Sequence, residues 1–363
     1  MTPEDRMLAA LSRQEPDCVP LYDLVDNVAV LAHYAGEPIT LENASQTIPR
    51  ALGRALDHTR IWLPSAPGER TDERGFRHQR ADWWNEWQVD TPFHGLAELA
   101  QFARREIERL EAPQAVSPCN LGRLQEWRDR FAPCTIPAVT AGEALANLYI
   151  PVGLDQFVML EAEEPDLVQR WLEAEHSATL RSLEAQADCR SISPIAWIFA
   201  DLAYRSGLMF SPRYLHDHGV FRHIHDMCEV LHGFGLKVIF HSDGDIRQMI
   251  PDLIEAGVDA LAPIETTAGM DLGELKREYG DRVAFCGGLD MPYTLRYGSV
   301  DDVRRATLRA IAAAGPGGGL ILGSSSEELY EDLPAANVIA MWETTRECGR
   351  YPIGQYFPKG FGG

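Results

Sequence analysis

A histidine and several acidic side chains directly follow apolar runs of the sequence, in positions where they can do chemistry. His241 comes after the run Lys237–Phe240, and Asp243 stands two residues later. An imidazole beside a carboxylate is typical of a metal site or of acid–base catalysis, with Asp243 as a second ligand or as the group that orients the ring. The structural alternative is a buried histidine that donates to a backbone carbonyl, while Asp243 or Asp245 caps the next helix.

Similar positions after the other apolar runs hold further candidates for the same site. Asp201 is expected to act with His241 and Asp243 in catalysis. Glu265 and Cys286 are candidate metal ligands, because zinc binds both carboxylates and thiolates. The alternatives are a loop carboxylate that helps to cap a helix and a small apolar residue that ends a strand. The side chains expected to contact a substrate are Tyr22, Asp23, Glu265, Asp290 and Ser326.

The elements that must position these side chains are eight short apolar runs separated by helical patterns. Continuous apolar runs are typical of strands that are buried on both faces, as in a parallel sheet. Eight alternating strand–helix units predict a (β/α)8 TIM barrel, whose active site lies at the carboxyl ends of the strands. The predicted strands are 18–22, 60–63, 136–140, 195–200, 237–240, 260–264, 282–285 and 319–322.

Residues 64–94 are predicted to form an insertion after the second strand, with a hairpin as the expected form. This stretch is rich in Gly, Arg, Asp and Trp, and Trp83, Trp84 and Trp87 either wall an aromatic pocket or simply pack the insertion. No linker interrupts the chain, so residues 1–363 are expected to form a single domain. The tail, residues 354–363, contains Pro358 and four glycines, and we expect it to order against a partner subunit, as in a homodimer.

Composition excludes several classes of function. The formal net charge of −21 argues against nonspecific nucleic-acid binding and against anionic membranes as partners. No apolar run approaches the roughly 18 residues that a membrane-spanning helix needs, and the first residues lack the pattern of a signal peptide. We therefore expect a cytoplasmic protein, whose seven scattered cysteines are reduced thiols.

Several segments together resemble the uroporphyrinogen decarboxylase superfamily, which includes cobalamin-dependent methyltransferases. The resemblance covers nearly the whole chain and implies the barrel fold. It rests on Arg6-Met7 to Ala10, Pro16 to Pro20, Ser211-Pro212, Lys237 to Gly244, Ala256 to Glu265, Gly287 to Asp290, Gly318 to Leu322, and Leu333-Pro334 to Asn337-Val338.

The resemblance also separates two branches of the superfamily. Decarboxylases carry a motif of the form Met-Arg-Gln-Ala-Gly-Arg, where this chain reads Tyr22-Asp23-Leu24-Val25-Asp26-Asn27. Acids in place of arginines would repel a polycarboxylate substrate. Methyltransferases that act on thiols have a zinc site of the pattern His-x-Cys with a later Cys. Here His241 matches the first ligand, Asp243 stands at the second and Ser326 at the third.

The resemblance therefore implies a methyltransferase that demethylates a small methylated ether or amine and passes the methyl group to a corrinoid protein. It implies a site with zinc, held by His241, Asp243, Glu265 and Cys286, or a site without metal. Two alternatives remain open. One is a decarboxylase of a carboxylated small molecule or of a porphyrinogen-like substrate, which would need an arginine cluster, with Arg205 and Arg213 as candidates. The other is a barrel that binds a small molecule without catalysis.

Overall fold

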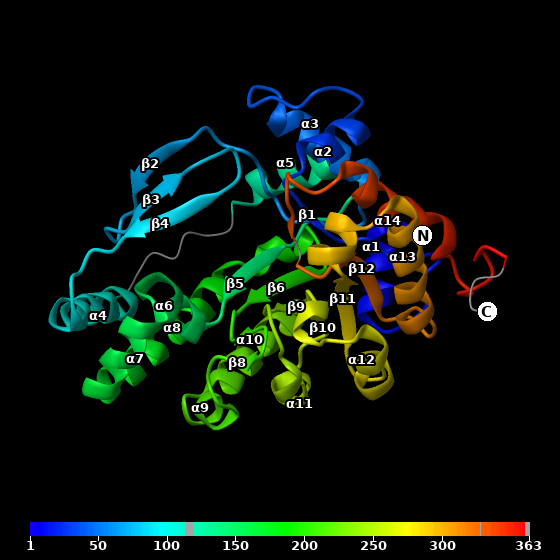
Figure 1. Ribbon diagram of the computed structural model, residues 1–363. Coiled ribbons are helices and arrows are strands. Elements are labelled where there is room, and N and C mark those ends of the chain that lie inside the picture. The colour runs from blue at the N-terminus through cyan, green and yellow to red at the C-terminus, as the bar shows by residue number, and fades with distance from the viewer. Residues whose placement is uncertain (113–119, 327, 360–363) are drawn as a thin grey trace.

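The computed structural model describes residues 1–112, 120–326 and 328–359, and a parallel β-sheet forms its centre (Figure 1). Six strands pair in the order β12-β11-β10-β9-β6-β5. Almost all of their side chains are buried, because helices and the barrel interior cover the two faces of the sheet. Their bounds are β5 Val139–Gly142, β6 Ile195–Phe199, β9 Lys237–His241, β10 Ala260–Ala262, β11 Ala284–Leu289 and β12 Leu320–Ser324.

Short backbone contacts join the two edges of this sheet. Leu21 bridges Leu322 of β12, Tyr22 bridges His58, and His58 bridges Thr135 just before β5. The Tyr22 amide donates to the Leu322 carbonyl at 3.0 Å, which fixes the first of these contacts. Beyond them, β1 (Leu24–Val25) pairs in parallel with β13 (Glu328–Leu329). These contacts close the strands into the predicted (β/α)8 barrel.

The second predicted strand is displaced. The run 60–63 was expected to be part of the wall, but the backbone bridges of this segment occur at His58. Ile61 and Leu63 pack against the hydrophobic core from outside any strand, which explains their apolar character. Arg60 therefore lies beyond the wall, at the rim where the strands end.

Helices surround the barrel, as the alternation of the sequence predicts. After β5 come α6 Ala144–Val152, α7 Leu154–Glu163 and α8 Pro165–Ala185. After β6 come the short β7 Ala203–Tyr204 and β8 Gly207–Leu208, then α9 Pro212–Asp217 and α10 Val220–Gly233. The remaining helices are α11 Ile250–Glu255, α12 Leu272–Tyr279, α13 Val300–Ala314 and α14 Ala335–Cys348, with short helical turns at 187–191, 247–249, 266–268 and 291–295.

The N-terminal helix α1 (Pro3–Leu11) closes one end of the barrel. Thr2 caps it, with the Thr2 hydroxyl accepting from the Asp5 amide in a capping box. Met7 and Leu11 are fully buried in the cluster that fills the barrel interior. Gln14, just after the helix, lies against Gly318, which precedes β12. Because α1 plugs the amino ends of the strands, a site must lie at the opposite end.

The predicted insertion after the second strand is a small antiparallel sheet. It consists of β2 (Gly68–Thr71), β3 (Arg77–Arg80) and β4 (Glu86–Asp90), and Figure 1 shows it projecting from the barrel. Trp84 at its base is buried, whereas Trp87 is exposed. The other helices of this half are α2 Val28–Ala35, α3 Ala44–Ala55, α4 Leu96–Glu111 and α5 Leu121–Phe131.

The expectation of reduced cysteines is wrong for Cys189. Cys18, Cys134, Cys228, Cys286 and Cys348 are not disulfide-bonded. Cys189, in contrast, is disulfide-bonded. Among the described residues, no helix combines the length and the apolar character that crossing a membrane requires.

Candidate active site at the ends of β6 and β9

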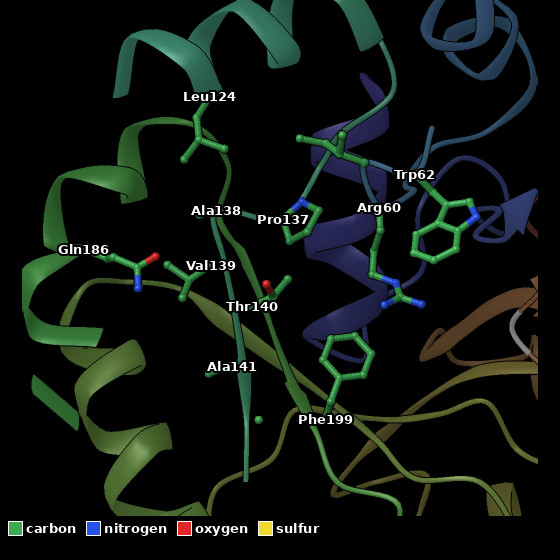
Figure 2. Close-up of a pocket in the computed structure, with 12 residues that line it drawn as sticks. Arg60, Trp62, Leu124, Pro137, Ala138, Val139, Thr140, Ala141, Gln186 and Phe199 are labelled. Atoms are coloured by element: carbon green, nitrogen blue, oxygen red, sulfur yellow. The ribbon is translucent and has the colours of Figure 1, made fainter. Parts of the chain in front are cut away.

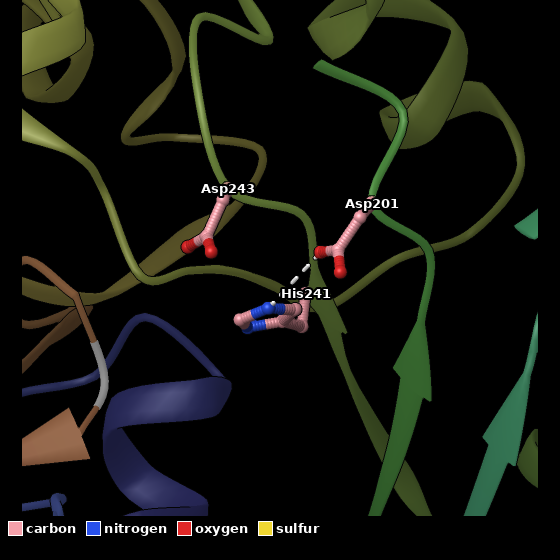
Figure 3. A group of neighbouring side chains, drawn as sticks. All are labelled: Asp201, His241 and Asp243. Carbon is pink, nitrogen blue, oxygen red and sulfur yellow. Dashed lines mark ion pairs between the residues drawn. The ribbon is translucent and has the colours of Figure 1, made fainter. Parts of the chain in front are cut away.

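Asp201, His241 and Asp243 converge at the carboxyl ends of two adjacent strands. Phe199 of β6 pairs with His241 of β9, so the residues that follow both strands emerge side by side. One ligand atom from each of the three side chains lies within 4.8 Å of the other two. His241 Nε2 is 3.4 Å from Asp201 Oδ1, and Figure 3 shows the three side chains around one space. The sequence prediction that these residues act together is thus consistent with their placement.

The loop after β9 is shaped by Ser242 and Gly244. The Leu202 amide donates to the Ser242 hydroxyl oxygen at 3.1 Å, which ties this loop to the one after β6. Gly244 has a φ of 87°, and a Cβ there would lie 2.6 Å from the Tyr204 backbone nitrogen. Only glycine allows the β7–β8 hairpin to approach so closely. The hairpin thus packs against the loop that carries Asp243, and the Asp245 amide donates to the Tyr204 carbonyl at 3.1 Å.

Asp201 is an anion held by its neighbours. Burial raises the pKa of this carboxyl group, but His241 and other neighbours together outweigh burial, so the pKa lies below its usual value. The Asp243 backbone amide and the charge of Arg60 act in the same direction. The Tyr149 hydroxyl donates to the Asp201 carbonyl oxygen and holds its backbone. Asp201 is therefore ionised near neutral pH and suited to orient an imidazole or bind a cation.

An aromatic wall lies next to His241. The Phe199 ring centroid is 5.2 Å from that of His241 and 5.6 Å from that of Trp197, on which it stacks. The Arg60 guanidinium carbon is 4.6 Å from the Phe199 centroid, a cation–π distance. Arg60 Nε also donates to the Tyr22 hydroxyl at 3.3 Å. The sequence reading missed Arg60 because it placed this residue inside a strand.

A cavity of about 470 Å³ adjoins this wall, and Phe199 lines it. Its other walls are β5, the segment 60–62, Leu124 and Gln186 (Figure 2). This volume is in the range of small-molecule sites. Phe199 therefore contacts His241 of the three-residue group and also lines the cavity that can hold a substrate.

The structure does not bring two of the predicted metal ligands into the three-residue group. Glu265 Oε2 accepts from the Gly244 amide at 2.8 Å and Oε1 accepts from the Thr267 hydroxyl at 2.7 Å, so Glu265 braces the loop that carries Asp243. Cys286 is fully buried in the cluster that fills the barrel interior. Its thiol lies among apolar side chains below the rim.

The residues predicted to contact a substrate are dispersed. Asp23 is fully buried, and its two oxygens accept from the Ser324 amide and the Trp342 indole, each at 2.7 Å. Tyr22 is buried against His58 and Trp197. Asp290 accepts from the Thr294 amide at 2.6 Å and thereby caps a helical turn.

Ser326 lies close to a residue that the sequence did not indicate. Its side chain hydrogen-bonds to Tyr330, whose hydroxyl also hydrogen-bonds to Glu328. Burial and the charges of Glu328 and Asp243 raise the pKa of Tyr330 well above its usual value. Tyr330 follows β13, so its place near Asp243 depends on barrel closure, and no local pattern of the sequence reports it.

Comparison with known proteins gives a consistent result. The model of the family described as uroporphyrinogen decarboxylase (URO-D) matches residues 145–348, more than half of the chain. A solved methyltransferase from Methanosarcina mazei shares the fold, with a TM-score of 0.67 and 17% sequence identity. That match covers 96% of this chain and 99% of the other. No curated protein sequence matches this one.

Proposed function

Because the chain belongs to the uroporphyrinogen decarboxylase family, we propose that it is a methyltransferase that demethylates a small methylated ether or amine and passes the methyl group to a corrinoid protein. The observation that carries the proposal is the Asp201–His241–Asp243 group at the carboxyl ends of β6 and β9. The fold shared with the Methanosarcina mazei methyltransferase supports the same class of reaction.

Methyl transfer from an ether or amine depends on help for the leaving group. When the C–O or C–N bond breaks, its electron pair stays on the oxygen or nitrogen, which becomes strongly basic. A proton donor or a fixed positive charge at that atom lowers the barrier. In this site Asp201 Oδ1 lies 3.4 Å from His241 Nε2 and orients the ring, and a protonated imidazole can place positive charge beside the leaving atom.

The same three side chains fit a zinc ion. An imidazole nitrogen and two carboxylate oxygens within 4.8 Å of one another are a suitable donor set. Catalytic zinc sites commonly use three protein ligands of this kind and leave a further position open. Bound by Asp201, His241 and Asp243, zinc would supply positive charge for the leaving atom. Asp243 is exposed, which leaves this end of the barrel accessible to the corrinoid of a partner protein.

Activity on a panel of methylated ethers and amines, with a reduced corrinoid acceptor, tests the proposal. We expect methyl transfer by the native protein and a loss of at least about 100-fold in His241→Ala, the usual effect of removing an acid–base group. The side chain lies at the rim, so circular dichroism of the variant should match that of the native protein. The control for the loss of one charge is Asp281→Asn, because Asp281 is exposed and is not part of the three-residue group. This variant should keep full activity.

Metal analysis of the same proteins tests the zinc assignment by itself. We expect about one equivalent of zinc in the native protein and in Asp281→Asn, and a large loss in His241→Ala and Asp243→Asn. Methyl transfer without bound metal would contradict the zinc assignment alone. Full activity of His241→Ala, or release of carbon dioxide from carboxylated substrates without methyl transfer, would overturn the proposed function.

A further inference from the structure

A second cavity, of about 320 Å³, lies where the insertion meets the rim of the barrel. The insertion contributes the turn between β3 and β4, with Asp82 and Trp84. The barrel contributes Asp26, just after β1, and the segment 330–332, just after β13. Segments that are far apart in the sequence thus enclose one space.

Two residues that line this cavity each carry a buried polar atom without a hydrogen-bond partner. Asp26 is 3% exposed, and its Oδ1 accepts no hydrogen bond. Trp84 is 2% exposed, and its indole Nε1 donates none. A buried polar atom without a partner costs about 1–3 kcal/mol, so such atoms point to a ligand or an ordered molecule that pairs with them. One atom is an acceptor with negative charge and the other is a neutral donor.

The charge around this cavity is strongly negative. Its lining includes four carboxylates and one guanidinium group, Arg296, which pairs with Asp332. Asp82 is fixed as an anion, because two backbone amides and the Asn85 side chain donate to it at 2.7–2.9 Å. Burial raises the pKa of Asp26 to about 7, and the charges of Glu328, Asp82 and Glu331 act in the same direction. A cation in the cavity would relieve this repulsion.

The arrangement of the carboxylates around the cavity suits an organic cation better than a metal ion. A divalent metal needs several ligand atoms that converge on one point. Within the described parts of the chain, the group of three or more potential ligands that converge is Asp201, His241 and Asp243, at the other site. The carboxylates of this cavity are instead spread around a space large enough for a small organic ion. Trp84 and Tyr330 supply aromatic surface, which favours ammonium groups through cation–π contacts.

We propose that the cavity between Asp26, Asp82 and Trp84 binds a small organic ammonium ion that also carries an oxygen acceptor. The ammonium group lies against Asp26, and the oxygen accepts the Trp84 indole N–H. This site goes beyond the proposed methyl transfer, and its occupancy is measured at equilibrium without turnover. Loss of methyl transfer in a variant would therefore leave the binding result intact.

Isothermal titration calorimetry at pH 8 with four probes tests the proposal. Choline offers an ammonium group and a hydroxyl, glycine betaine an ammonium group and a carboxylate, and tetramethylammonium no oxygen. The fourth probe, 3,3-dimethyl-1-butanol, has the shape of choline without its charge. We expect choline or glycine betaine to bind most tightly, tetramethylammonium more weakly, and the uncharged alcohol at least about 10-fold more weakly than choline.

Two variants and one control locate the binding. Asp26→Asn keeps the shape of the side chain and should weaken binding of choline at least about 10-fold. Trp84→Phe keeps an aromatic ring and should weaken the oxygen-bearing probes while leaving tetramethylammonium unchanged. Asp281→Asn, which removes an exposed charge elsewhere, should bind all probes like the native protein. Thermal unfolding of each variant confirms that it is folded at the temperature of the titration.

Three results would overturn the proposal. The first is equal binding of choline and the uncharged alcohol, which would make the cavity merely apolar. The second is the absence of binding by any ammonium probe, or binding that Asp26→Asn does not weaken. The third is binding of Mg²⁺ or Ca²⁺ that Asp26→Asn abolishes and that displaces the ammonium probes, which would make the site a metal site.

Discussion

Replacing Asp26 with asparagine should stabilise the protein at alkaline pH. The folded state raises the pKa of this carboxyl group from 3.8 to about 7, first by burial and then by the nearby carboxylates. The folded protein therefore holds this proton more tightly than the unfolded chain does. The contribution of Asp26 to the free energy of unfolding is therefore largest below pH 3.8. It falls as the pH rises from 3.8 to about 7 and is constant above pH 7.

The size of the effect follows from the pKa. At about 1.4 kcal/mol for each pH unit, a rise from 3.8 to about 7 corresponds to a ceiling of about 4 kcal/mol. Asparagine has the same shape, accepts the hydrogen bond from Trp62 and adds no charge beside Glu328. We expect Asp26→Asn to be about 2–4 kcal/mol more stable than the native protein at pH 8. With an unfolding entropy of about 2.1 cal/mol/K per residue, this is a rise in Tm of about 3–5 °C.

Urea unfolding of both proteins at pH 4.5 and pH 8 measures the effect. At pH 4.5 the native carboxyl group is mostly protonated in the folded state, so the gain should shrink to about 1 kcal/mol. Asp281→Asn is the matched control, and its stability should change by no more than about 0.5 kcal/mol at either pH. An equal or lower stability of Asp26→Asn at pH 8, without added ligand, would show that the carboxylate has a stabilising partner in solution and would refute this reasoning.

Two further substitutions test how the fold supports the site. Gly244→Ala should lower the free energy of unfolding in urea by at least about 2 kcal/mol more than Gly235→Ala does. Both glycines have a positive φ, but only a Cβ at Gly244 would clash with backbone atoms. Equal losses in the two variants would contradict the close approach of the β7–β8 hairpin. Burial lowers the pKa of His58 to about 3, so the native protein should lose up to about 2 kcal/mol of stability between pH 6.5 and pH 5, as the unfolded chain gains a proton that folded His58 does not. His58→Phe should be less stable at pH 7 but should lack this part of the pH dependence, and an unchanged slope would assign it to other groups.

Much of the barrel could be predicted from the sequence because its strands are continuous apolar runs. The last five predicted strands lie within a few residues of the structure, including β9, which ends at His241. The second strand could not be placed, because Ile61 and Leu63 are apolar for a different reason: they pack on the core without entering a strand. An apolar pattern reports burial, and it does not report which backbone groups are paired.

The sequence could predict the site residues that directly follow adjacent strands. It could not predict the contacts that form only when the two ends of the chain meet to close the barrel. Asp201, His241 and Asp243 follow adjacent strands, so local pattern and barrel topology together bring them to one place. Asp23 also follows a strand, but its carboxylate accepts hydrogen bonds from Ser324 and Trp342, residues about three hundred positions away. No local signal distinguishes a carboxylate that holds the two ends of the chain together from one that faces a substrate.

The acidic rim constrains the charge of the molecule that enters it. Asp201 is ionised, Asp243 is exposed beside it, and Asp26, whose pKa is raised first by burial and then by nearby carboxylates, lines the second cavity. A polycarboxylate substrate would meet repulsion at each of these positions, which argues against decarboxylation of such a molecule. A cation gains from the same field, and so does a reaction in which positive charge assists a leaving group.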